Sequence, residues 1–212
     1  MGIPLIFWDV DTQVDFMRAD GKLYVPDSEA IIPALATLTH HAHRHGIPIV
    51  ASADDHQPTD AELSAAPDFT TTFPPHCMHG TPGQAKLRET VLTDPLALAS
   101  APVPPAELEA AVRAHRGDYL LLKQRFDVFS NPNTLPLLRL LDPAHVVLYG
   151  VALDVCNKAA IDGLLAHYPS AQVTLVTDAV RAIRPEAGAE LIEGWTRRGV
   201  RLATVAEVTA SS

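Results

Sequence analysis

The chain has 212 residues, of which 47% are hydrophobic and 19% charged, and its formal net charge is −9. This length suits one domain, and the balance of apolar and charged residues excludes a disordered chain and a coiled coil. The acidic charge, without any basic run, argues against nucleic acid as the main partner. The apolar runs are far shorter than the roughly 20 residues of a membrane-spanning helix, so no membrane partner is expected.

The N-terminal residues enter a strand-like segment at once and show no charged stretch or long apolar stretch of the kind that marks a signal peptide. We therefore expect a cytoplasmic protein. In that compartment the two cysteines, Cys77 and Cys156, are expected to remain free thiols.

Six short apolar runs predict β-strands, and helical patterns lie between most of them. The predicted strands, in chain order, are residues 5–10, 48–52, 119–122, 145–149, 173–177 and 201–204. The predicted helices are residues 29–45, 106–115, 134–141, 156–167 and 185–198. Continuous apolar runs are typical of strands covered on both faces. The alternation predicts a three-layer α/β/α fold with a doubly wound, mainly parallel six-stranded sheet.

A long, proline-rich segment, residues 54–105, separates the second and third predicted strands. A connection of this length is uncommon unless it has a function. We expect one domain over residues 1–212 that carries this segment as a functional loop. The Ala- and Pro-rich stretch at residues 96–106 is interpreted as a surface connection.

Polar side chains follow the first four predicted strands, at the edge where a doubly wound sheet binds its ligand. They are Asp11 with Asp9 two residues before it, Asp54 with His56, Lys123, and Cys156 behind a short turn. An acid, a lysine, a thiol and an Asp-x-His pair at one edge indicate an enzyme with a cysteine nucleophile.

Cys156 by itself would most often be a buried, inert side chain. Asp154 offers a cap for the helix that begins here, and a thiol in the first turn has its pKa lowered by the helix dipole. Lys123 follows three leucines and therefore needs an anionic partner, which Asp11 can supply. Cys77 lacks such a context and is assigned a structural role. Four histidines at the end of the first long helix, His40, His41, His43 and His45, are interpreted as a solvated face.

Five motifs occur in the order typical of one family. They are Asp11-Thr12-Gln13-Val14-Asp15-Phe16, Asp54-Asp55-His56, Phe73-Pro74-Pro75-His76-Cys77 followed by Gly80-Thr81-Pro82-Gly83, Lys123, and Gly150-Val151-Ala152-Leu153-Asp154-Val155-Cys156. With these motifs the chain resembles the nicotinamidase branch of the isochorismatase-like cysteine hydrolases. Three departures leave the substrate open: Leu153 where Thr or Ser is frequent, Phe73 where Trp is frequent, and Glu62 in the region where many nicotinamidases have another histidine.

The resemblance implies a catalytic triad of Asp11, Lys123 and Cys156, in which Cys156 forms a thioester and Asp11 moves the proton. It implies an oxyanion site at the backbone N–H groups of Ala152 and Cys156, with a cis peptide bond between Val151 and Ala152.

The resemblance also implies one divalent metal ion, Zn²⁺ or alternatively Fe²⁺ or Mn²⁺. Its ligands would be Asp54, His56 and His76, with Glu62 as a further candidate. Phe16 and Phe73 are the residues expected to hold a flat substrate ring.

Three functions remain open at this point. The first is hydrolysis of nicotinamide to nicotinate and ammonia. The second is hydrolysis of another small amide, ureide or carbamoyl compound by the same triad. The third is a catalytically silent binding member, or a vinyl-ether hydrolase that does not use the cysteine. The sequence also leaves open whether the chain forms a homo-oligomer.

Overall fold

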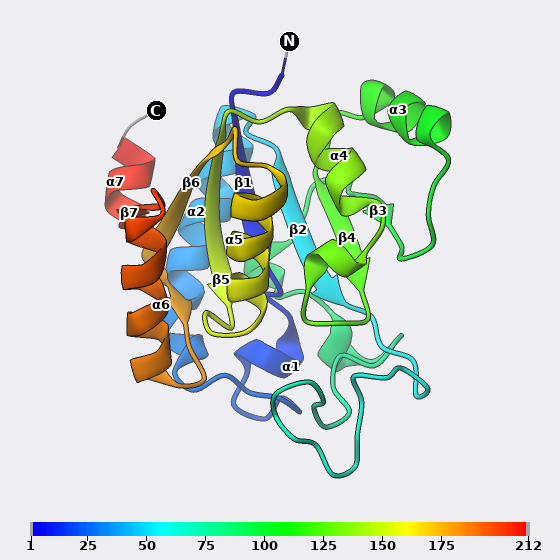
Figure 1. Ribbon diagram of the computed structural model, residues 1–212, viewed down its shortest axis with the longest axis vertical. Helices are drawn as coiled ribbons and strands as arrows, with labels where there is room; N and C mark the ends of the chain where they lie inside the picture. The colour runs from blue at the N-terminus through cyan, green and yellow to red at the C-terminus, as the bar shows by residue number, and fades with distance from the viewer. Residues whose placement is uncertain (1, 211–212) are drawn as a thin grey trace.

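The computed structural model describes residues 2–210, and a parallel β-sheet runs through its middle (Figure 1). Within these residues seven strands pair in the order β3-β4-β2-β1-β5-β6-β7, and every pair is parallel. The strands are β1 (Leu5–Val10), β2 (Ile49–Asp54), β3 (Leu96–Leu98), β4 (Tyr119–Lys123), β5 (His145–Val151), β6 (Gln172–Arg181) and β7 (Arg201–Ala203). The predicted doubly wound parallel sheet is confirmed, with seven strands in place of six.

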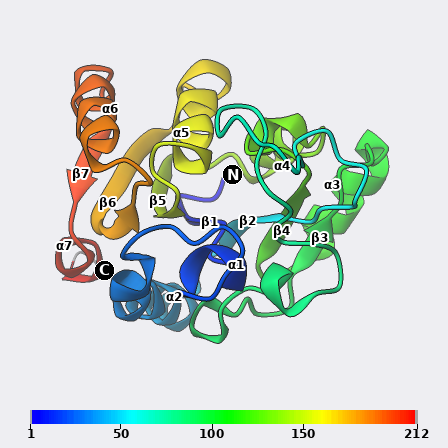
Figure 2. The same ribbon diagram turned by 90° about the horizontal axis from the view of Figure 1, so that it is seen from below.

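Helices cover both faces of the sheet and complete the three predicted layers (Figure 2). Their bounds are α1 (Val14–Met17), α2 (Ile32–His45), α3 (Pro105–Ala114), α4 (Thr134–Leu141), α5 (Cys156–His167), α6 (Pro185–Arg197) and α7 (Val205–Ala210). Helices α3 to α6 lie on one face, and α1, α2 and α7 lie on the other. The predicted helices are all present. Helices α1 and α7 were not predicted, because segments this short show no clear helical period.

The two faces of β1 explain why the strands appear in the sequence as continuous apolar runs. Ile6 and Trp8 point into the core beneath α3 to α6, whereas Phe7 points into the core beneath α2. All three side chains are fully buried. Apolar residues are therefore required at successive positions, as expected for a strand covered on both faces.

Strand β3 corrects the prediction that residues 96–106 form a surface connection. Its residues pair with Tyr119, Leu120 and Leu121 at the edge of the sheet, and Leu98 is buried. A three-residue strand beside several prolines is too short to show a period in the sequence.

The histidines at the end of α2 correct a second prediction, because they do not form a uniformly solvated face. His41 is buried, and its ring stacks on Phe7 with 6.0 Å between the ring centroids. His43 Nε2 lies 2.8 Å from a carboxylate oxygen of Asp118. These side chains fasten α2 to the sheet at the end opposite the site described below.

The strand order reverses beside β1, which is the central strand of the sheet. The chain proceeds from β1 to β2 on one side and later to β5, β6 and β7 on the other. Such a reversal opens a ligand-binding crevice at the carboxyl ends of the strands. The long connection between β2 and β3 folds over this same end, at the bottom of Figure 1. Among residues 2–210, no helix has the length and apolar character needed to cross a membrane.

Candidate active site

The carboxyl ends of four neighbouring strands bring the three predicted catalytic residues together with Asp54, a predicted metal ligand. Asp11 directly follows β1, Asp54 ends β2, Lys123 ends β4, and Cys156 begins α5 just after β5. These strands are adjacent in the order β4-β2-β1-β5, and the four residues are all buried. Residues from separate parts of the chain thus meet at the predicted edge of the sheet.

Lys123 lies between two carboxylates and the thiol. Its Nζ is 2.9 Å from Oδ2 of Asp11 and 3.9 Å from Sγ of Cys156, and it also donates a hydrogen bond to Oδ1 of Asp54. The predicted contact between Lys123 and Asp11 is therefore present, and Asp54 is an additional partner that the sequence did not indicate. The other carboxylate oxygen of Asp11 accepts a hydrogen bond of 2.6 Å from the Ser52 hydroxyl.

Burial and the neighbouring charges determine the ionisation of these groups. Burial opposes the charge of Lys123, but the carboxylates of Asp11 and Asp54 raise its pKa well above the ordinary value. Burial also raises the pKa of Asp11, with Lys123 opposing it. Burial raises the pKa of the Cys156 thiol well above its ordinary value, and the charge of Lys123 only partly offsets this. The sequence predicted a lowered thiol pKa at the helix start, whereas burial and the neighbouring carboxylates of Asp11 and Asp54 raise this pKa.

Asp154 does not cap α5, which corrects another prediction. The residue before the helix is Val155, and no side-chain cap is present there. The carboxylate of Asp154 instead accepts hydrogen bonds from the backbone N–H groups of Ile183 (2.8 Å) and Arg184 (3.0 Å). Asp154 therefore fastens the connection between β6 and α6 to the turn that carries Cys156.

The turn between β5 and α5 holds both residues of the predicted oxyanion site. The peptide bond between Val151 and Ala152 is cis, as the family resemblance implies. The carbonyl oxygen of Ala152 accepts hydrogen bonds from the backbone N–H groups of Val155 and Asn157. Ala152 and Cys156 both line the same pocket, so the two residues lie beside any molecule bound in it.

Asp54, His56, Glu62 and His76 form a buried cluster whose ligand atoms all lie within 4.8 Å of one another. Asp54 Oδ2 is 3.3 Å from Nε2 of His76 and 3.8 Å from Nε2 of His56, and Glu62 Oε1 is 3.8 Å from the same His56 nitrogen. Two imidazoles with carboxylates are a donor set that suits Zn²⁺, Fe²⁺ or Mn²⁺. All four candidate ligands, Glu62 among them, are therefore brought together.

The outer contacts of these side chains orient them for a cation. His76 Nδ1 is 2.7 Å from the carbonyl oxygen of Pro74, and His56 Nδ1 is 3.3 Å from a carboxylate oxygen of Asp60. Such contacts keep the proton on Nδ1 and leave Nε2 as the ligand atom. His56 Nε2 is buried and has no hydrogen-bond partner among the described residues. Glu62 is held by a 2.6 Å hydrogen bond from the backbone N–H of Phe126. The residues therefore fit a divalent ion.

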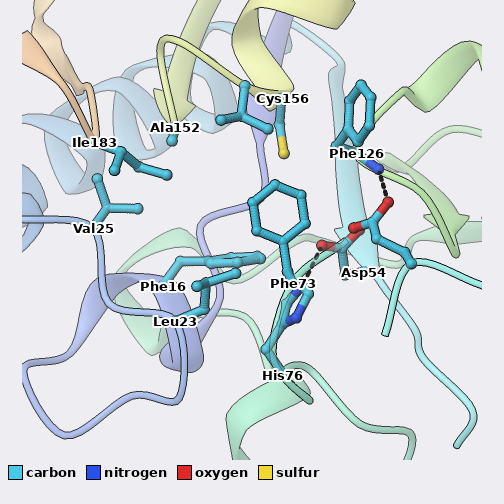
Figure 3. A pocket seen from close by; sticks show the side chains of 12 residues that line it. Phe16, Leu23, Val25, Asp54, Phe73, His76, Phe126, Ala152, Cys156 and Ile183 are labelled. Atoms are coloured by element: carbon cyan, nitrogen blue, oxygen red, sulfur yellow. Dashed lines mark hydrogen bonds and ion pairs between the residues drawn. The ribbon is translucent and has the colours of Figure 1, made fainter. Parts of the chain in front are cut away.

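An apolar pocket connects the thiol to the cluster of candidate metal ligands (Figure 3). Cys156 points its sulfur into this pocket from one side, while Asp54 and His76 border it on another. Its lining consists of Phe16, Leu23, Val25, Asp54, Glu62, Phe73, His76, Phe126, Ala152, Val155, Cys156 and Ile183. Phe16 and Phe73, the predicted ring-binding residues, both line it. Sequence analysis missed Leu23, Val25, Phe126, Val155 and Ile183, which come from loops and turns without a periodic pattern.

Cys77 follows His76 in the chain, is buried, and is not among the residues that line the pocket. Burial raises the pKa of its thiol. Its backbone N–H donates a 2.7 Å hydrogen bond to the carboxylate of Asp15, which also accepts from the backbone N–H of Lys22. This setting agrees with the structural role predicted for Cys77.

Comparison with known families gives a match over almost the whole chain. The sequence model of the isochorismatase domain matches residues 5–207. The chain belongs to the isochorismatase-like hydrolase family. The resemblance seen in the motifs is thereby confirmed.

Relatives of this isochorismatase-like chain include a curated nicotinamidase/pyrazinamidase from Mycobacterium tuberculosis, which is 37% identical over 75 residues. That alignment covers 35% of this chain and 39% of the relative, so it spans well under half of the relative's length.

Two solved structures share the fold of this isochorismatase-like chain. A pyrazinamidase from Pyrococcus horikoshii in complex with zinc has a TM-score of 0.72 at 24% identity, covering 94% of this chain and 98% of its own. An N-carbamoylsarcosine amidase from Thermoplasma acidophilum has a TM-score of 0.71 at 23% identity, and the match covers 96% of this chain and 97% of the amidase chain.

Proposed function

We propose that this chain is a metal-dependent cysteine amidohydrolase that converts nicotinamide and water to nicotinate and ammonia. The observation that carries the proposal is a pocket that reaches from the buried Cys156 thiol to the cluster of Asp54, His56, Glu62 and His76, while Lys123 contacts both the thiol and Asp11 behind the pocket lining. The pyrazinamidase and nicotinamidase names of its relatives support this choice of reaction.

In the first half of the reaction, Sγ of Cys156 attacks the amide carbon while the thiol proton moves to the Asp11 carboxylate. The carbonyl oxygen gains negative charge and accepts hydrogen bonds from the N–H groups of Ala152 and Cys156. Asp11 then returns the proton to the amide nitrogen as the C–N bond breaks. Ammonia leaves, and the acyl group remains on Cys156 as a thioester.

In the second half, Asp11 accepts a proton from water as the water oxygen attacks the thioester carbon. The C–S bond breaks, the carboxylic acid is released, and the proton returns to Cys156. Lys123 keeps Asp11 in place by the 2.9 Å ion pair and supplies a positive charge beside the developing thiolate.

A divalent ion held by Asp54, His56, Glu62 and His76 would supply a Lewis-acidic contact for a ring nitrogen and so orient the substrate. The aromatic side chains Phe16, Phe73 and Phe126 border the same space and suit a flat ring. The carboxamide on the other side of such a ring would then face Cys156.

The lining of the pocket favours an uncharged aromatic amide over a carboxylate-bearing ureide. Among the described residues that line it, none is a lysine or arginine. Lys123 lies behind the lining and is already paired with two carboxylates. A substrate carboxylate would therefore gain no cationic side chain in the lining, and to recover its lost hydration it would have to take the metal contact proposed for the ring nitrogen.

Ammonia release from nicotinamide, benzamide and an N-carbamoyl amino acid tests the proposal. Benzamide has the same ring size and the same amide but no ring nitrogen. We expect turnover of nicotinamide and a kcat/KM for benzamide lower by up to roughly 10⁴-fold, because a site built for a polar group rejects an analogue without it. Equal kcat/KM for the two amides would exclude the metal-oriented pose. Hydrolysis of the carbamoyl compound alone would exclude nicotinamide as the substrate.

A further inference from the structure

An ion pair that is buried except for part of the Lys86 side chain lies beside the Asp11 turn and plays no part in the mechanism above. Asp9 is fully buried in β1, two residues before Asp11. Lys86 reaches it from the long connection between β2 and β3. The Lys86 Nζ atom lies 2.9 Å from Oδ2 of Asp9 and donates a 2.8 Å hydrogen bond to the hydroxyl of Thr12. Lys86 thereby links Asp9, which precedes Asp11 in the chain, to Thr12, which follows it. None of Asp9, Thr12 and Lys86 lines the pocket.

Backbone hydrogen bonds join the same two segments. The N–H of Leu87 donates to the carbonyl of Thr12 at 2.9 Å, and the N–H of Val14 donates to the carbonyl of Ala85 at the same distance. The hydroxyls of Thr12 and Thr90 are 2.7 Å apart. Residues 85–90 therefore hold the chain immediately after Asp11. Among the described residues, Lys86 is the only member of this segment that forms an ion pair with Asp9.

Asp11 needs such support because its backbone is left-handed, with φ of 48°. Residues other than glycine rarely adopt this conformation, and it persists where surrounding contacts fix it. The conformation places the carboxylate between Lys123 and Ser52.

The ion pair is a costly way to stabilise a fold. A buried pair is often no more stabilising than apolar residues of the same volume. Oδ1 of Asp9 has no hydrogen-bond partner among residues 2–210, so part of the cost of burying this carboxylate is not recovered. A pair of this kind, located next to a strained catalytic turn, points to a role in the geometry of that turn.

We propose that Lys86 is a positioning residue, which holds the Asp11 turn through Asp9 and Thr12 so that the Asp11 carboxylate meets Cys156. The proposal rests on the proposed function, in which Asp11 moves the proton. Its consequence is that a residue on the metal-binding connection, outside the pocket, controls the chemical step at Cys156.

Lys86→Met tests this role, because it removes the ammonium group and keeps most of the length of the side chain. We expect kcat to fall about tenfold to a hundredfold, in line with the cost of a small misplacement of a catalytic group. KM should change less than threefold, since Lys86 does not line the pocket. The rate at which iodoacetamide labels Cys156, measured per folded molecule, should fall in parallel. Lys86→Arg should restore part of kcat, and Arg113→Met, which breaks the surface pair with Glu109, should change neither quantity.

The double variant Asp9→Asn/Lys86→Met separates positioning from stability. Removing both charges should restore the melting temperature lost in Lys86→Met, while kcat stays low because Thr12 still lacks its tie to Lys86. The proposal is overturned if kcat of Lys86→Met stays within twofold of the parent, or if the double variant regains kcat together with stability. The labelling rate needs no substrate, so failure of the parent to hydrolyse nicotinamide would count against the proposed function alone.

Discussion

Lys123 is the side chain on which the whole arrangement of charges depends. It is fully buried, it contacts the carboxylates of Asp11 and Asp54, and it lies 3.9 Å from the sulfur of Cys156. A buried lysine between two buried carboxylates leaves one excess negative charge if all three groups ionise. In the proposed mechanism, transfer of a proton from Cys156 to Asp11 would therefore move charge within a site that Lys123 keeps close to neutral.

Lys123→Met removes the positive charge and preserves most of the volume. We expect kcat/KM to fall at least about 10²-fold, because the variant loses one electrostatic element of the reaction and leaves Asp11 without its partner. Ammonia release measures this loss. Circular dichroism should show a folded protein, and a folded variant within a few-fold of the parent would exclude a catalytic role for Lys123.

Glu62 is the residue that distinguishes this cluster from one with a third histidine. Its Oε1 faces His56 and its other oxygen is held by the Phe126 N–H, so the carboxylate is fixed in place. Glu62→Gln removes the charge and keeps the shape. We expect retention of metal after dialysis to weaken at least about tenfold, as measured by elemental analysis. Glu109→Gln, on the surface of α3, is the control and should retain metal like the parent. Equal metal content in both variants would remove Glu62 from the ligand set.

At the scale of the elements, the connection between β6 and α6 forms one wall of the pocket. Ile183 contributes to that wall, and Asp154 holds Ile183 and Arg184 by two hydrogen bonds to backbone N–H groups. Asp154 lies two residues before Cys156. Cys156 and the wall at Ile183 are thus connected through one carboxylate.

Asp154→Asn replaces one accepting oxygen with a donor that faces an N–H group. Hydrogen bonds to a charged group contribute about 1.5–3 kcal/mol each, so the connection should loosen and the wall at Ile183 should become less ordered. We expect KM for nicotinamide to rise several-fold with a smaller change in kcat, measured by initial rates. An unchanged KM would show that the wall does not depend on Asp154.

The elements that sequence analysis predicted correctly are those with a strong local pattern. The apolar run of β1 and the helices α4 and α5 were predicted with their observed bounds. Strand β3 was missed because three residues beside prolines carry no period. The shift of the Cys156 thiol pKa was predicted in the wrong direction because a helix start is visible in the sequence, whereas burial of the thiol depends on the packing of distant segments.

The site residues, too, were predicted only where a local sequence pattern marks them. Residues at strand ends, such as Asp11, Asp54 and Lys123, could be placed at one edge from the strand order expected for a doubly wound sheet. Sequence analysis could not predict the pocket walls at Phe126 and Ile183, because they depend on how loops fold back over the sheet. The same holds for the ion pair between Asp9 and Lys86.

At the scale of the whole molecule, the metal-type cluster joins the long connection to the sheet. Asp54 ends β2, whereas His56, Glu62 and His76 lie in the connection that follows it. A bound ion would therefore hold this connection against the carboxyl end of the sheet. We propose that the sheet and the connection form one domain, with residues 54–105 as its metal-binding part.

Chelation tests this coupling. Saturation at 100 times the dissociation constant stabilises a folded protein by about 2.7 kcal/mol. For a chain of this size that corresponds to a shift of roughly 5–10 °C in Tm. We expect EDTA to lower Tm by roughly 5–10 °C, with unfolding still a single transition. EDTA should also speed proteolytic cleavage within residues 57–80. A second, separate transition would contradict a single domain, and an unchanged Tm would contradict a metal that links the connection to the sheet.

The measurement that tests the central claim most directly is acid quenching of the enzyme during turnover of nicotinamide, followed by peptide mapping by mass spectrometry. We expect a nicotinoyl group on the peptide that carries Cys156 and none on the peptide that carries Cys77. Cys156→Ala should fold, bind metal, carry no acyl group and release no ammonia. Ammonia release by Cys156→Ala at a rate near that of the parent, or acylation of Cys77 instead, would contradict a thioester mechanism at Cys156.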